Sequence, residues 1–141
     1  MNYTEQTFKD WLTAIPAKLK IVTEEFAKEE GLKLDFSIES LDELEKWILK
    51  NYDEAADLRE DTEMLDLLSL YIGETFIRLV NGDWFVELEN KKSLLYQNIV
   101  VKFKDEDGDT DYRSTRVLCT TCITRKKGNV ISSTFRKILA S

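Results

Sequence analysis

Residues 63–84 read EMLDLLSLYIGETFIRLVNGDW and form the most apolar stretch of the chain. Their apolar side chains recur at intervals of three and four, which predicts a helix, and they occupy more than one side of it. A helix of this kind is usually buried between two layers. Gly82 is placed to end the helix in the left-handed conformation. From Trp84 to Glu89 the apolar residues alternate with others, which predicts a strand after the helix.

A small polar group interrupts this apolar helix. Gly73 costs about 1 kcal/mol relative to alanine inside a helix, and the usual compensation is close approach of another element. Glu74 and Arg78 have the i, i+4 spacing that favours an ion pair. Together with Tyr71 and Trp84 they form a candidate ligand pocket. The structural alternative, which is the commoner one, is a tyrosine with one polar end and an ordinary ion pair.

Length and composition favour one soluble domain covering residues 1–141. A chain of 141 residues is long enough to bury a core without a disulfide or a metal. Its 43% hydrophobic and 33% charged residues are typical of a globular protein. We expect no secretory signal and no membrane span. With two cysteines, this favours a reducing cytoplasm.

Charge is distributed unevenly along the chain. Residues 1–70 contain 18 acidic and 8 basic residues, a net charge of −10, whereas residues 71–141 contain 9 acidic and 12 basic residues, a net charge of +3. No acidic residue follows Tyr112, although seven basic residues do. An overall charge of −7 disfavours non-specific binding to nucleic acid. The acidic half instead favours a basic protein as a partner.

The N-terminal half is predicted to be mainly helical. We expect helices over 5–14 and 16–30, because Pro16 would cost ~3 kcal/mol or more inside a helix but is tolerated in a first turn. A single kinked helix is the alternative. Gly31 is predicted to end the second helix. Residues 32–36 alternate and form either a short strand or an extended linker.

A third helix is expected to start at Ser40, which with Glu43 has the spacing of a capping box. This helix runs through Trp47 towards Tyr52. The acidic segment 53–61 is either a loop or the exposed first turns of the central helix.

The C-terminal half is predicted to contain the sheet and two more helices. Strands are expected at 84–89, 94–96 and 99–103, followed by an acidic turn at 105–109. A helix is expected at about 111–126, and a last short helix is expected to be capped by Ser132 or Ser133. The sequence therefore predicts an α+β domain. N-terminal helices and a central buried helix pack on a small antiparallel sheet of three or four strands, followed by C-terminal helices.

Few residue patterns point to catalysis, a metal or a cofactor. The chain has no histidine, the commonest general base and metal ligand, and no glycine-rich phosphate motif. Cys119 and Cys122 have redox spacing, but no second ligand pair for zinc exists, and we expect both thiols to be buried in a helix. The acidic turn lacks the spacing of a calcium-binding loop. We predict no catalytic residue, no metal site and no cofactor.

Two segments together resemble a known group of proteins. LDFSIESL at 34–41 leads into a helix, and YIGE at 71–74 is followed by Gly82 and Trp84. The chain resembles small, mostly bacterial domains of unknown function that carry a Tyr-x-Gly-Glu helix running into a strand with tryptophan. Ile38 stands where the pattern has proline. The resemblance covers the middle third of the chain and implies a bacterial, cytoplasmic α+β domain. It carries over no catalytic residue.

The leading functional hypothesis is a non-enzymatic protein-interaction domain, similar in size and composition to immunity or accessory proteins. Its acidic surface would include Glu24, Glu25, Glu29 and Glu30. The alternative is a ligand or enzymatic pocket around the YIGE helix. A phosphate site at 125–127 ranks third.

Overall fold

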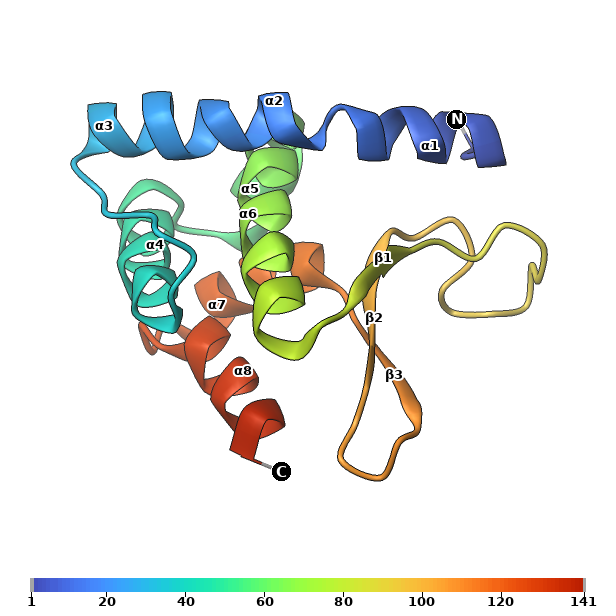
Figure 1. The fold of residues 1–141 in the computed structure, drawn as a ribbon. Coiled ribbons are helices and arrows are strands. Elements are labelled where there is room, and N and C mark those ends of the chain that lie inside the picture. Colours follow the sequence, from blue (N-terminus) through green and yellow to red (C-terminus); the bar gives the residue numbers. More distant parts are fainter. Residues whose placement is uncertain (1, 141) are drawn as a thin grey trace.

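A long helical rod crosses one side of the molecule. The computed structural model describes residues 2–140. The rod consists of α1 (Glu5–Thr13), α2 (Ile15–Lys20), the π-helix η1 (Ile21–Phe26) and α3 (Ala27–Glu30) (Figure 1). Pro16 lies in the first turn of α2, and Gly31 ends α3 with a φ of +68°. The predictions of a break at Pro16 and an end at Gly31 are confirmed.

The π-helical segment is a feature that the sequence did not predict. The N–H of Ala27 donates to the carbonyl of Val22, five residues earlier, instead of four. The hydroxyl of Thr23 donates to the carbonyl of Leu19 at 2.8 Å. Such a side-chain bond competes with the backbone bonds of an α-helix and is consistent with the wider winding here.

The linker after the rod is not a strand. Residues 32–36 have no ladder partner among the described residues, and Leu34 is buried in the core. The following helix, α4 (Ile38–Asn51), is capped by Ser37 and not by Ser40. Ser37 has extended backbone angles, and its hydroxyl accepts from the N–H of Ser40 at 3.1 Å. The predicted capping box at Ser40 is wrong because the chain already turns into the helix three residues earlier.

The acidic segment before the central helix forms a short helix of its own, α5 (Ala55–Glu60), with a capping box between Glu54 and Asp57. The central helix, α6 (Thr62–Val80), follows directly. Its left-handed C-terminal residue is Asn81, with a φ of +56°, and not Gly82 as predicted. Gly82 serves close packing instead, since a Cβ there would lie 2.8 Å from the carbonyl oxygen of Lys102.

The sheet has three antiparallel strands in the order β1 (Asp83–Phe85), β2 (Val100–Lys104) and β3 (Thr110–Arg113). This confirms the α+β class and the small antiparallel sheet, but the predicted strand 84–89 is too long and the predicted strand 94–96 is wrong. The first strand stops at Phe85, and Glu87 then accepts hydrogen bonds from the N–H groups of Glu89 and Asn90, which turns the chain. Residues 94 and 95 are in turns and Tyr96 makes only an isolated bridge to Glu87, while the third strand occupies the start of the predicted 111–126 helix.

Two helices complete the chain, α7 (Thr115–Arg125) and α8 (Val130–Ala140). The predicted start of α8 at Ser132 or Ser133 is wrong. The carboxylate of Glu45, on α4, accepts hydrogen bonds from the N–H groups of Val130 (3.0 Å) and Ile131 (2.8 Å). A side chain from a distant helix therefore supplies the cap.

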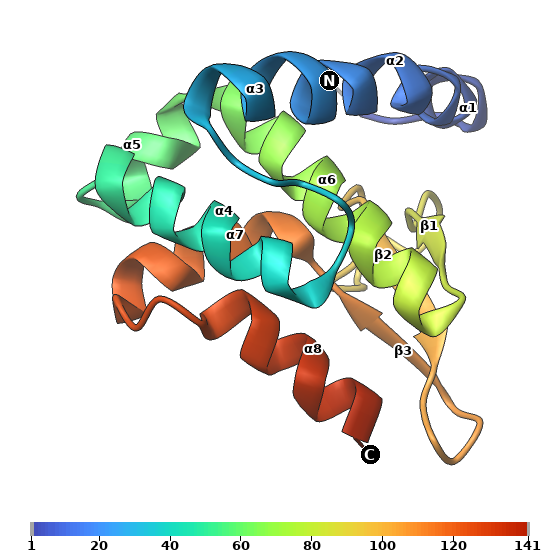
Figure 2. The same ribbon diagram turned by 60° about the vertical axis from the view of Figure 1, so that its left-hand side comes forward.

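The core lies around α6, in the middle of the ribbon in both views (Figures 1 and 2). The ring of Phe76 stacks on Phe135 of α8 at 4.4 Å and meets Phe103 of β2 edge-on at 4.9 Å. The central helix is thus buried between layers, as predicted. No helix within residues 2–140 has both the length and the apolar character needed to cross a membrane.

Candidate functional site

Glycine at position 73 makes room for a tryptophan from the sheet. A Cβ on Gly73 would lie 2.0 Å from Cη2 of Trp84, so the indole rests directly on the bare helix backbone. The indole N–H of Trp84 donates to a carboxylate oxygen of Glu74 at 2.8 Å. The same indole meets the ring of Trp11 edge-on, with centroids 5.0 Å apart. The close approach predicted at Gly73 is therefore confirmed, and Glu74 fixes the orientation of Trp84.

The other two predicted pocket residues lie at a different place. Tyr71 is fully buried, and its hydroxyl accepts from the N–H of Phe36 (2.8 Å) and bonds to the hydroxyl of Ser40 (2.7 Å). Burial raises the pKa of Tyr71 above its ordinary value. The guanidinium of Arg78 lies 3.4 Å from the centre of the Phe36 ring, which itself stacks on Tyr71.

The predicted ion pair between Glu74 and Arg78 is wrong, because each side chain has another partner. Glu74 accepts from the indole of Trp84, and Arg78 makes a cation–π contact with Phe36. The four predicted pocket residues therefore form two separate pairs, one holding Trp84 and one holding the 32–37 linker.

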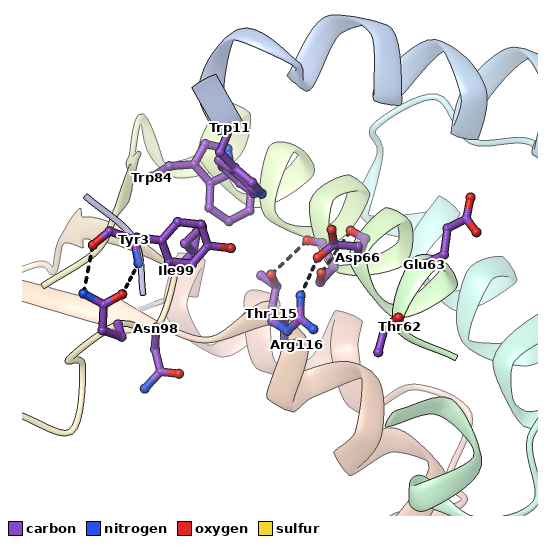
Figure 3. A pocket seen from close by; sticks show the side chains of 12 residues that line it. Tyr3, Trp11, Thr62, Glu63, Asp66, Trp84, Asn98, Ile99, Thr115 and Arg116 are labelled. Atoms are coloured by element: carbon purple, nitrogen blue, oxygen red, sulfur yellow. Dashed lines mark hydrogen bonds and ion pairs between the residues drawn. The ribbon is translucent and has the colours of Figure 1, made fainter. Parts of the chain in front are cut away.

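A cavity of about 440 Å³ opens between α1, the chain before β2, and the facing sides of α6 and α7 (Figure 3). Of the four predicted pocket residues, only Trp84 lines it. The lining residues are Tyr3, Trp11, Thr62, Glu63, Asp66, Ser69, Trp84, Gln97, Asn98, Ile99, Thr115 and Arg116. The sequence did not point to this cavity, because its walls come from segments separated by up to about a hundred residues.

One wall of the cavity is aromatic and is held in place by an amide. The side chain of Gln97 bonds to the backbone of Tyr3 in both directions, accepting from its N–H and donating to its carbonyl at 3.1 Å. This joins the N-terminal segment to the loop before β2. Tyr3, Trp11 and Trp84 then lie on one side of the cavity, and Figure 3 shows the hydroxyl of Tyr3 directed towards the opposite wall.

The opposite wall is polar and highly connected. Asp66 pairs with Arg116 through one oxygen and with Lys18, 3.7 Å away, through the other. The hydroxyl of Thr115 donates to the carbonyl of Ser69 at 2.8 Å, which ties the start of α7 to α6. These contacts fix polar groups of two helices at the cavity wall.

The four glutamates predicted to bind a partner are all exposed on the rod. Glu24 and Glu25 belong to η1, and Glu29 and Glu30 belong to α3. Within residues 2–140, none of these four carboxylates takes part in an ion pair. Their negative charge is therefore directed to solvent and is not balanced by a direct contact.

The two cysteines are free thiols buried in α7, as predicted. Burial raises the pKa of Cys122 to about 12, and raises that of Cys119 as well. Both groups therefore remain protonated and poorly nucleophilic at neutral pH.

The acidic turn between β2 and β3 brings three carboxylates together. Oxygens of Asp105, Asp107 and Asp109 all lie within 4.8 Å of one another. Asp107 and Asp109 are exposed, and Asp105 already accepts from the backbone N–H groups of both. These backbone contacts account for the position of Asp105 within the turn.

No family model, curated protein or solved structure matches the chain. The geometry of these sites is therefore the basis for the function proposed below.

Proposed function

We propose that this chain is a non-enzymatic protein-binding domain that uses the acidic rod surface, defined by Glu24, Glu25, Glu29 and Glu30, to bind a basic protein. The observation that carries the proposal is the set of four exposed, unpaired carboxylates on one helical element. Like charges of this kind repel one another in the folded protein, and a bound cationic partner relieves that repulsion. The same charges steer the approach of the partner.

The π-helical segment supports this proposal through geometry. Hydrogen bonding over five residues, as between Ala27 and Val22, brings positions five apart towards the same side of the helix. Glu24 and Glu29 have this spacing, and so do Glu25 and Glu30. With two of the glutamates in η1 and two in α3, all four carboxylates lie in one short stretch of the rod.

A second group of acids extends the surface. The segment between α4 and α6 exposes Asp53, Glu54, Asp57 and Glu60. Both α5 and the rod pack on α6, and both views show α5 beneath the rod (Figures 1 and 2). A basic partner could therefore contact both groups.

The test compares three immobilised proteins exposed to the same extract of cells that produce this protein. They are the wild type, a variant with all four rod glutamates changed to glutamine, and a matched control with Glu89→Gln, Glu106→Gln, Asp107→Asn and Asp109→Asn. The control residues are exposed, are in no ion pair among residues 2–140, and lie outside the rod. Both variants change the net charge by the same amount.

We expect a basic partner to be retained by the wild type and the control, and to be lost from the rod variant. At about 0.5 kcal/mol per exposed charge pair, four substitutions should weaken binding by about 2 kcal/mol, or roughly 30-fold. Raising salt from about 0.05 M to 0.5 M should also weaken it. Equal retention by all three proteins, or binding indifferent to salt, would refute the proposal.

A further inference from the structure

The cavity beside Trp84 has the composition of a small-ligand site and is separate from the acidic rod surface. Its volume of about 440 Å³ falls within the range of about 300–1,000 Å³ found for small-molecule sites. Trp11 and Trp84 supply aromatic surface to one wall. Trp84 cannot turn freely, because Glu74 holds its indole N–H and Gly73 lies beneath its ring. This wall is therefore pre-organised.

The remaining lining groups offer hydrogen-bond donors and acceptors in a mixture. Tyr3 presents a hydroxyl group. The side-chain amide of Asn98 donates through its nitrogen to the carbonyl of Leu94, which leaves its oxygen as an acceptor. Arg116 has further N–H donors besides the one that bonds to Asp66. Thr62 adds a further hydroxyl. A ligand with several hydroxyl groups can both donate to and accept from such a set.

The charges around the cavity already balance one another. Both oxygens of Asp66 are occupied, one by Arg116 and one by Lys18. The charged lining residues are Glu63, Asp66 and Arg116, and Lys18, which pairs with Asp66 from outside the lining, brings the group to two cations and two anions. The group therefore has no net charge to attract a charged ligand, and an anion would have to compete with Asp66 for both cations.

From these three features we infer that the cavity binds a neutral, polyhydroxylated ligand, namely a pyranose sugar. The apolar C–H face of the ring packs on the indoles through dispersion. Its hydroxyl groups bond to the mixed polar wall, where each must find a partner to offset the loss of water. The ring is small enough for the cavity, and it carries no charge.

The test is an NMR titration that follows the three indole N–H signals. The probes are the methyl β-glycosides of glucose, galactose, mannose and N-acetylglucosamine, with glucuronate and glucosamine as charged counterparts. Trp11 and Trp84 line the cavity, whereas Trp47 packs against Phe26 and Tyr52 elsewhere and serves as an internal control. We expect at least one neutral glycoside to shift the first two signals, with a Kd in the millimolar range, and to leave the third unchanged.

Two variants with matched controls locate the binding. Trp11→Ala should lower the affinity for the glycoside that binds by about three- to tenfold. Leu12→Ala, on the same helix and outside the cavity lining, should leave the affinity unchanged. Arg116→Gln should weaken it by a similar factor, and Arg125→Gln, near the other end of α7, should not. The dispersion of the spectra shows directly whether each variant is folded.

Three results would overturn the inference. The first is that no glycoside of the panel shifts the signals of Trp11 and Trp84. The second is that all three tryptophans respond equally, which would indicate non-specific contact. The third is tighter binding of glucuronate or glucosamine than of the glycosides, which would assign the cavity to a charged ligand. These results are independent of the acidic surface, so the two proposals can fail separately.

Discussion

The contact between Gly73 and Trp84 provides the sharpest test of the structure. Glycine to alanine in an exposed helix normally stabilises by about 1 kcal/mol. Here the new Cβ would lie 2.0 Å from one indole carbon and 2.4 Å from the next, at least 1 Å closer than ordinary contact. The indole cannot yield without losing its hydrogen bond to Glu74 and its contact with Trp11.

The expected effect of Gly73→Ala follows from these losses. A hydrogen bond to a carboxylate contributes about 1.5–3 kcal/mol and an aromatic pair about 0.5–1.5 kcal/mol. Subtracting about 1 kcal/mol for helix propensity leaves a net destabilisation of about 2 kcal/mol. Urea unfolding followed by far-UV circular dichroism measures this value without depending on tryptophan fluorescence.

The decisive control is the same substitution in a Trp84→Leu background. A leucine is too short to reach Gly73, so Gly73→Ala should there be neutral or stabilising by up to about 1 kcal/mol. The effects of Gly73→Ala on the free energy of unfolding in the two backgrounds should differ by about 2–3 kcal/mol, which is the coupling energy of the pair. If Gly73→Ala stabilises the wild type as it would an exposed helix, Trp84 does not rest on this backbone.

Three further predictions concern buried and capping groups. Glu45→Gln should destabilise the fold by about 1–3 kcal/mol in urea unfolding, because an amide leaves a buried N–H at the start of α8 without an acceptor; an unchanged midpoint would contradict this cap. Neither Cys119 nor Cys122 should react with a disulfide reagent at pH 8 until the protein unfolds, when both should, since burial raises both pKa values. Hydrogen bonds from Ser37 lower the pKa of Asp35, so its contribution to stability is present above about pH 4 and is lost as the pH falls through the lower folded value. Ser37→Ala removes the hydroxyl donor and should raise that pKa in an NMR titration, and an unchanged value would show that the hydroxyl bond does not form.

Local patterns in the sequence predicted several of the helices, although not the π-helical segment or the starts of α4 and α8. Three of these predictions depend on residues within one or two helical turns, and all three are confirmed. They are the helix at 63–80 from the spacing of its apolar residues, the break at Pro16 and the helix end at Gly31. The expected approach of another element to Gly73 is also confirmed. This prediction was possible because a glycine inside a helix usually indicates close packing against its backbone.

The errors in the sheet have a local cause that sequence patterns do not resolve. Residues 86–99 contain apolar residues at strand-like spacing, but the carboxylate of Glu87 bonds to the backbone and turns the chain. The strand Thr110–Arg113 is only four residues long, which is too short for a periodic signal against the helix that follows it. Its place is set by antiparallel pairing with β2 across the acidic turn.

The sequence by itself determined the central helix, the α+β class and the acidity of the first half, since these depend on neighbouring residues and on composition. Only the tertiary structure decided which groups meet. It separated Tyr71 and Arg78 from Glu74 and Trp84, placed Glu45 at the start of a helix 85 residues away, and built a cavity from segments as far apart as Tyr3 and Arg116. Those contacts join residues far apart in sequence, and their partners are set by packing in three dimensions and not by spacing along the chain.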